Sequence, residues 1–102
     1  HVVDLAKGHL SALKYAFENK GTETINLGTG KGSSVLEVLH SFEKACEKEI
    51  PYVFSERRSG DIAVCYADTS KAEKLLNWSA QYNLDEMTSD SWNFIKNNPE
   101  GL

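Results

Sequence analysis

Residues 55–68 read SERRSGDIAVCYAD, and this stretch carries the most specific chemistry in the chain. It follows an apolar run, PYVF at residues 51–54, and places two guanidinium groups and a carboxylate around a Ser-Gly turn. The planar fork of an arginine matches phosphate oxygens two at a time. A carboxylate can accept hydrogen bonds from the paired hydroxyls of a ribose. The stretch therefore has the groups that would bind a nucleoside diphosphate.

The candidate binding residues in this stretch are Arg58, Ser59, Gly60 and Asp61. A simpler interpretation is a solvated turn in which Arg57 or Arg58 pairs with Asp61, because exposed ion pairs of this kind are common and weak. The residue types alone leave both interpretations open.

Composition narrows the class of protein. The 102 residues suit one small domain, and 40% hydrophobic and 25% charged residues are ordinary for a globular protein. A net charge of −4 without a run of Lys and Arg argues against a nucleic-acid surface. No apolar stretch approaches the roughly 20 residues of a membrane span. Cys46 and Cys65 have no metal-ligand or disulfide-rich spacing, which predicts reduced thiols in a cytoplasmic protein and no metal site.

Periodicity predicts an α/β fold of about four helices with two or three short strands. The helices are expected over residues 4–17, from Ser33 or Ser34 to about residue 48, from residues 68–70 to 78, and from residue 83 to 97. The strands are expected at residues 22–27 and 51–54, with residues 62–67 partly extended.

Two helix starts carry the signature of a capping box, in which a short polar residue precedes a glutamate by three positions. The pairs are Ser34 with Glu37 and Asn83 with Glu86. Asp4 is the expected cap of the first helix. Apolar residues at helical spacing predict a buried stripe along that helix, made of Leu5, Ala6, Leu10, Leu13, Ala16 and Phe17.

The glycine-rich loop NLGTGKG at residues 26–32 lies between a predicted strand and a predicted helix, as in dinucleotide-binding proteins. The fingerprint G-x-G-x-x-G fails, because its third glycine position is Ser33. A Walker A loop is also absent. A tight turn that needs glycine for its backbone geometry is therefore favoured over a cofactor site.

The sequence of residues 57–68, RRSGDIAVCYAD, resembles the C-terminal substrate-binding segment of the UDP-glucose 4-epimerase family, also called UDP-galactose 4-epimerases. These are extended short-chain dehydrogenases/reductases. Further blocks resemble the family in the same order, so the resemblance covers essentially the whole chain. They are HVVDLAKGH at 1–9, NLGTGKG at 26–32, SVLE at 34–37, DSW at 90–92 and NPEG at 98–101. Ser33 departs from the family, which often has tyrosine there.

The resemblance implies that residues 1–102 are the C-terminal UDP-sugar-binding portion of a Rossmann-type enzyme whose N-terminal NAD-binding domain is missing here. Such an enzyme interconverts UDP-glucose and UDP-galactose through a transient 4-keto sugar and bound NAD. By resemblance Arg58 meets the diphosphate, Asp61 meets the ribose hydroxyls, and Cys65 lines the sugar pocket. A small residue at Cys65 implies room for the N-acetylated sugar pair as well.

The resemblance also implies which parts are not in this chain. The family's catalytic Tyr-x-x-x-Lys pair does not occur, so no catalytic or cofactor-binding residue is expected here and the fragment alone should be inactive. The expected partner is a UDP-hexose, with no nucleic acid and no membrane. The full-length enzyme is expected to form a homodimer through its N-terminal domain.

Two alternatives of different kinds remain open at this stage. The chain could be the C-terminal part of another nucleotide-sugar dehydratase or decarboxylase of the same superfamily. It could also be a stand-alone module that binds a nucleotide or a partner protein without catalysis. An upstream reading frame with a glycine fingerprint and a Tyr-x-x-x-Lys would favour the enzyme.

Overall fold

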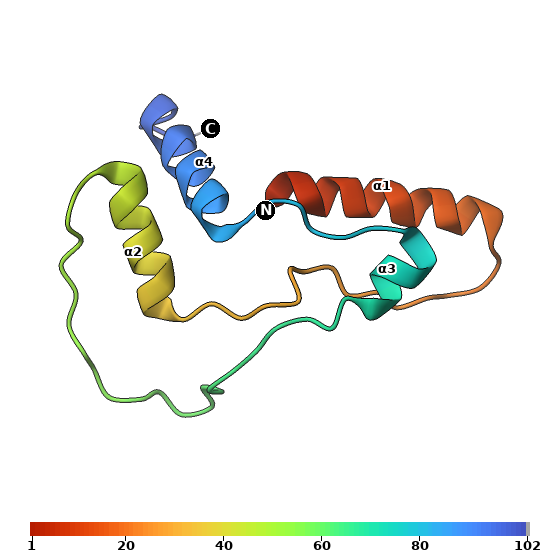
Figure 1. Cartoon of the computed structure of the whole chain (residues 1–102), viewed down its shortest axis with the longest axis horizontal. Helices are drawn as coiled ribbons and strands as arrows, with labels where there is room; N and C mark the ends of the chain where they lie inside the picture. Colours follow the sequence, from red (N-terminus) through yellow and green to blue (C-terminus); the bar gives the residue numbers. More distant parts are fainter. Residues whose placement is uncertain (102) are drawn as a thin grey trace. The chain divides into compact units, whose positions relative to one another are not determined.

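A computed structural model describes residues 1–101 of the chain, and its regular structure is helical (Figure 1). The helices are α1 (Val2–Glu18), α2 (Val35–Cys46), α3 (Ser70–Leu76) and α4 (Leu84–Asn97). The chain divides into two compact units. The first unit comprises His1–Gly32 and Val64–Tyr82, and the second comprises Ser33–Ala63 with the described residues from Asn83 onward.

The four predicted helices are confirmed, whereas the predicted strands are wrong. Residues 22–27, 51–54 and 62–67 are irregular, and no strand forms within residues 1–101. A strand needs a neighbouring strand to receive its backbone hydrogen bonds, and these segments have no such partner among the described residues. Their branched and aromatic side chains suit a pleated, half-buried surface. That preference alone does not supply the partner strand, so the regular structure of the described residues is helical.

Both predicted capping boxes are confirmed. At α2 the Ser34 backbone N–H donates to Glu37 Oε2 at 2.6 Å, and the Glu37 N–H donates to Ser34 Oγ at 3.2 Å. At α4 the corresponding N···O distances between Asn83 and Glu86 are 2.7 and 3.0 Å. The backbone and hydroxyl of Ser34 hold the pKa of Glu37 below its ordinary value. These local pairs fix where α2 and α4 begin.

The start of α1 differs from the prediction. Its cap is His1, whose Nδ1 accepts from the Val3 N–H at 3.1 Å. Asp4 lies inside the helix and is 2% exposed. Its Oδ2 accepts the backbone N–H groups of Gln81 and Tyr82, each at 3.0 Å. Asp4 therefore joins the helix to a segment far away in the sequence instead of capping its own first turn.

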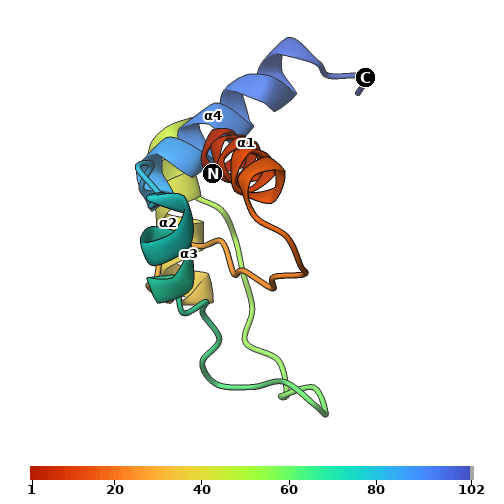
Figure 2. The same ribbon diagram turned by 90° about the vertical axis from the view of Figure 1, so that its right-hand side faces the viewer.

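The first unit has an apolar core where α1 packs against α3, a pairing that Figures 1 and 2 both show. Trp78 is 7% exposed, and its Nε1 donates to the Asp4 carbonyl at 3.1 Å. Gly8 faces this core, since a Cβ there would lie 2.6 Å from Leu27 Cδ1. The buried core residues are Ala72, Leu76 and Trp78, with Ala12, Tyr15, Ile25, Leu27, Leu75 and Ala80 packed around them.

The predicted buried stripe of α1 is exposed in this structure, which corrects the sequence interpretation. The side of α1 that faces the core carries Asp4 and Gly8, both buried. Gly8 has no Cβ, which lets Leu27 and Trp78 approach the helix closely, and the Asp4 carboxylate receives hydrogen bonds across the contact. Phe17 remains 83% exposed, and the whole predicted set is exposed: Leu5, Ala6, Leu10, Leu13, Ala16 and Phe17. Periodicity correctly located an apolar face of α1, but within the described residues it is a different face of the helix that is buried.

In the second unit, α2 packs against α4, and polar side chains are hydrogen-bonded to one another between the two helices. Ser41 and Thr88 are 4% and 3% exposed, and their hydroxyl oxygens lie 2.7 Å apart. Ser41 Oγ also donates to Asp85 Oδ1 at 2.5 Å. Lys44 Nζ lies 3.5 Å from the other carboxylate oxygen of Asp85, in an exposed ion pair. The hydrogen bond from Ser41 and the charge of Lys44 hold the pKa of Asp85 below its ordinary value.

Candidate functional site

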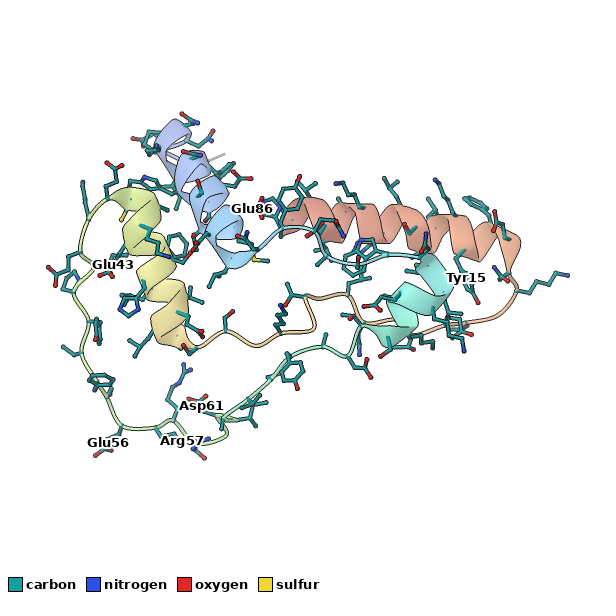
Figure 3. The ribbon with its side chains drawn as sticks, viewed as in Figure 1. Tyr15, Glu43, Glu56, Arg57, Asp61 and Glu86 are labelled. Carbon is teal, nitrogen blue, oxygen red and sulfur yellow. The ribbon has the colours of Figure 1, made fainter. Side chains whose placement is uncertain are left out.

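The Arg-rich stretch forms a turn in the second unit, on the irregular segment between α2 and α3. The Asp61 N–H donates to the Arg58 carbonyl at 3.3 Å and closes the turn. Gly60 within it has a φ of +88°, a left-handed backbone that residues with a Cβ rarely adopt. Figure 3 labels Arg57 and Asp61 on this segment. Glycine at position 60 is therefore explained by the turn itself, because it permits the bend that brings Arg58 and Asp61 together.

The two arginines make different contacts with Asp61. Arg57 Nη2 donates to the Asp61 backbone carbonyl at 2.7 Å. Arg58 Nε lies 3.2 Å from the Asp61 carboxylate oxygen Oδ2. The side chain of Arg58 is 86% exposed and that of Asp61 is 43% exposed. The ion pair that the sequence left open is thus present in this structure, and Arg57 holds the backbone of the turn.

This exposed pair does not remove Arg58 from consideration as a ligand-binding residue. An exposed ion pair contributes about 0.2–1 kcal/mol, while a hydrogen bond to a charged group contributes about 1.5–3 kcal/mol. A bound diphosphate could therefore displace the Asp61 contact. The pair places the guanidinium and the carboxylate next to each other in this structure.

Cys65 lies in the first unit, whereas Arg58, Ser59, Gly60 and Asp61 lie in the second. The structure joins Arg58 and Asp61 through the turn and the ion pair, and Ser59 is an exposed residue of the same turn. Cys65 is an exposed, free cysteine. It immediately precedes residues 66–69, which contact the glycine-rich loop of the first unit.

The glycine-rich loop packs against residues 66–69, a contact that sequence reasoning missed. A Cβ at Gly28 would lie 2.9 Å from Ala67 Cβ, and one at Gly32 would lie 3.6 Å from Tyr66 Cδ1. Gly30 has a φ of +71°, which confirms a turn that needs glycine. The available signal was glycine at every second position of residues 28–32, which leaves one edge of the loop without side chains.

The segment after Cys65 is connected to α3 by short polar contacts. Ser70 donates to Asp68 Oδ1 through its hydroxyl and through its N–H, the latter at 3.0 Å. These two bonds, the hydroxyl one first, hold the pKa of Asp68 below its ordinary value. Lys71 Nζ lies 2.7 Å from Glu23 Oε2 and ties α3 to the segment before the glycine-rich loop. The start of α3 is therefore fixed on both sides.

The described residues contain neither a metal-binding cluster nor a membrane-spanning helix. Within residues 1–101, no three His, Cys, Asp or Glu side chains gather as a metal ion would require. Over the same residues, every helix is too short or too polar to cross a bilayer.

No protein-family model matches the chain. The chain is 54% identical to UDP-glucose 4-epimerase 1 of Oryza sativa subsp. japonica, over 99% of its own length and 29% of that protein. It is 52% identical to the UDP-glucose 4-epimerase of Mus musculus, over 100% of its own length and 29% of that protein. The Bacillus subtilis (strain 168) UDP-glucose 4-epimerase is 50% identical, with 99% and 30% covered.

A solved structure agrees with these relatives. The crystal structure of UDP-glucose 4-epimerase from Bifidobacterium longum, in complex with NAD+ and UDP, matches with a TM-score of 0.91 and 51% identity. The match covers 100% of this chain and 30% of that one. The resemblance predicted from the sequence is confirmed, and the fold is that of a part of such an enzyme. The chain spans about 30% of the length of the relatives it matches.

Proposed function

We propose that residues 1–102 are the C-terminal UDP-sugar-binding portion of a UDP-glucose 4-epimerase. The observation that carries the proposal is the continuous similarity over 99–100% of the chain, together with a TM-score of 0.91 to an epimerase chain in complex with NAD+ and UDP. The intact enzyme then interconverts UDP-glucose and UDP-galactose. The chemistry at C4 of the sugar belongs to residues outside this chain, because no Tyr-x-x-x-Lys occurs here.

NAD is the proposed cofactor of the intact enzyme, but the residues of this chain do not fit it. A dinucleotide needs glycines that let its pyrophosphate approach a helix N-terminus. The open edge of the loop at residues 28–32 faces Ala67 and Tyr66 instead. Its pattern also lacks the third glycine. We therefore assign this chain the UDP-sugar side of the reaction and expect NAD to be held elsewhere.

In the proposed site, Arg58 contacts the diphosphate and Asp61 accepts hydrogen bonds from the ribose hydroxyls. Gly60 supplies the left-handed backbone of the turn, and Ser59 lies beside it. Arg57 has a separate task, since its bond to the Asp61 carbonyl stabilises the turn. On binding, the exposed Arg58–Asp61 pair exchanges for ligand contacts of greater strength. A turn that is already closed loses little conformational entropy in this exchange.

Titration of UDP against the intact enzyme tests these roles. Arg58→Ala should weaken UDP binding by about 1.5–3 kcal/mol, since it removes a charge-assisted contact. Arg57→Ala is the matched control and should weaken binding less, because the turn can still close through the Asp61 N–H. Equal losses, or a larger loss in Arg57→Ala, would assign the phosphate contact to the wrong arginine.

Cys65 is proposed to border the sugar pocket and to leave room for an N-acetyl group. This extends the substrates of the intact enzyme to UDP-N-acetylglucosamine and UDP-N-acetylgalactosamine. The support is its small, exposed side chain together with the family resemblance of residues 57–68. In Cys65→Tyr, turnover of the acetylated pair should fall selectively. A parallel loss of both pairs, or no change in either, would remove Cys65 from substrate choice.

Product analysis separates the epimerase from the other candidates. An epimerase returns UDP-hexoses of unchanged mass, a dehydratase or decarboxylase yields a lighter product, and a binding module leaves the sugar unchanged. The isolated 102-residue chain should turn over neither sugar, because the residues that act at C4 lie outside it. A homodimer formed through the region outside this chain, and a cytoplasmic location in keeping with two free cysteines, complete the proposal.

A further inference from the structure

The glycine-rich loop has no role in the binding scheme above, yet it contacts the segment that carries Cys65. Each of its alternate glycines faces that segment. Gly28 faces Ala67, Gly32 faces Tyr66, and Gly30 lies 3.5 Å, measured from a built Cβ, from Thr69 Oγ1. Cys65 immediately precedes the contacted residues in the sequence.

The contact at Gly28 is the closest of the three. A Cβ there would be 2.9 Å from Ala67 Cβ, a distance that real Cβ atoms essentially never show. Both atoms are attached directly to backbone, so no side-chain rotation can relieve the overlap. One of the two backbone segments would have to move.

Residues 66–69 are held more firmly at one end than at the other, and this difference decides which part of the segment moves. Beyond Thr69 the chain enters α3, where Ala72 is 0% exposed and Lys71 pairs with Glu23. On the other side, Cys65 and Tyr66 are exposed. Displacement of Ala67 is therefore transmitted toward Cys65, because that side has less packing to resist it.

We propose that Gly28 is a positioning residue for sugar choice: its missing side chain lets residues 66–69 lie against the loop, and this contact fixes the position of Cys65. The inference rests on the proposed function, in which Cys65 borders the sugar. It gives the glycine-rich loop a structural task toward the substrate in place of the phosphate-binding task that its pattern suggests.

Two alanine substitutions in the same loop form a matched pair. Gly28→Ala creates the overlap with Ala67, whereas Gly32→Ala adds an ordinary van der Waals contact with Tyr66. Neither glycine has a left-handed φ, so neither alanine is strained by its backbone. Gly30 is unsuitable for this comparison because its φ of +71° adds strain of another kind.

The experiment uses the intact enzyme and two readouts. The first is the rate at which a maleimide modifies Cys65, followed by mass spectrometry of the peptide that contains it. The second is the ratio of kcat/KM for the acetylated pair to kcat/KM for the glucose and galactose pair. In Gly28→Ala we expect the ratio to change about tenfold, since small misplacements at a site have large kinetic effects. The modification rate should change with it, and Gly32→Ala should stay within about twofold of wild type in both.

A compensating variant keeps the test decisive if Gly28→Ala folds poorly. Gly28→Ala combined with Ala67→Gly removes the overlapping atom and should restore both readouts. Equal behaviour of Gly28→Ala and Gly32→Ala, an altered modification rate with an unchanged ratio, or failure of the double variant to restore them would overturn the inference. If the wild-type enzyme turns over no UDP-hexose, the proposed function fails, and the modification rate still reports whether Gly28 positions Cys65.

Discussion

Each of the two units of this chain is stabilised internally by a different kind of interaction. In the first unit, Trp78 and Leu76 lie in an apolar core between α1 and α3, and Asp4 receives hydrogen bonds across it. In the second unit, the contact between α2 and α4 is centred on the hydroxyls of Ser41 and Thr88. Within residues 1–101, every buried hydrophobic residue belongs to the first unit.

The difference indicates how each unit should respond to substitution. Burial of a large apolar side chain contributes about 1.5–3 kcal/mol and leaves a cavity when removed. A neutral hydrogen bond contributes about 0.5–1.5 kcal/mol, because water competes for the same groups. Substitutions in the first unit should therefore cost more stability than equivalent substitutions in the second.

The largest effect is expected for Trp78→Ala. Removing this side chain deletes the centre of the core and leaves a cavity, so the free energy of unfolding should fall by about 3–5 kcal/mol. Hydrogen exchange of the α3 amides measures the loss locally. Trp78→Phe is the control, since it removes the bond to the Asp4 carbonyl but keeps an aromatic ring in the core and should therefore cost less. Equal losses in the two variants would mean that the hydrogen bond outweighs the packing.

Asp4→Ala should have the next largest effect. It leaves the N–H groups of Gln81 and Tyr82 without their acceptor in a part-buried site, and each such group costs about 1–3 kcal/mol. We expect a loss of about 3 kcal/mol. Asp4→Asn retains one acceptor oxygen and should recover part of it. Urea unfolding of both variants gives the comparison; an unchanged midpoint for Asp4→Ala would show that water replaces the carboxylate.

Ser41→Ala should destabilise the second unit more weakly, by about 1 kcal/mol. The Asp85 carboxylate is largely exposed and can turn to water, and Thr88 can still donate to the backbone carbonyls of its own helix. Ser89→Ala, at an exposed position of α4, is the control and should lie within about 0.5 kcal/mol of wild type. A loss in Ser41→Ala as large as that in Trp78→Ala would contradict the contrast between the units.

The smallest effect concerns pH and Asp85. Its pKa is depressed by the Ser41 hydroxyl and by the charge of Lys44, so the folded form holds this proton less tightly than the unfolded chain. The stabilisation is complete above the ordinary aspartate pKa of about 3.9 and is lost as pH falls through the folded value. Asp85→Asn should therefore flatten the decline in stability of the second unit on acidification below that pH. An NMR titration of the Asp85 carboxyl carbon measures the pKa directly, and a value at or above the ordinary one would contradict this account.

The features that the sequence predicted correctly depend on residues close together in the chain. The pairs Ser34 with Glu37 and Asn83 with Glu86 lie three positions apart, and one turn of helix brings them into contact whatever else the chain does. The turn at Gly60 and the Arg58–Asp61 pair have the same local origin. The similarity of residues 57–68 to UDP-glucose 4-epimerases could likewise be recognised from the sequence of these residues alone.

The tertiary structure decided what depends on distant partners. Asp4 does not cap its own helix but accepts hydrogen bonds from Gln81 and Tyr82, which lie 77 and 78 positions further along the chain. Gly28 contacts Ala67, which lies 39 positions further along. The local sequence could not predict these contacts because the partners are so distant. The apolar stripe of α1 and the two expected strands, at residues 22–27 and 51–54, were misread for the same reason. Periodicity shows that a face or an edge is available, but burial and strand pairing require a second segment. That segment's position follows from the packing of the whole chain, not from the local sequence.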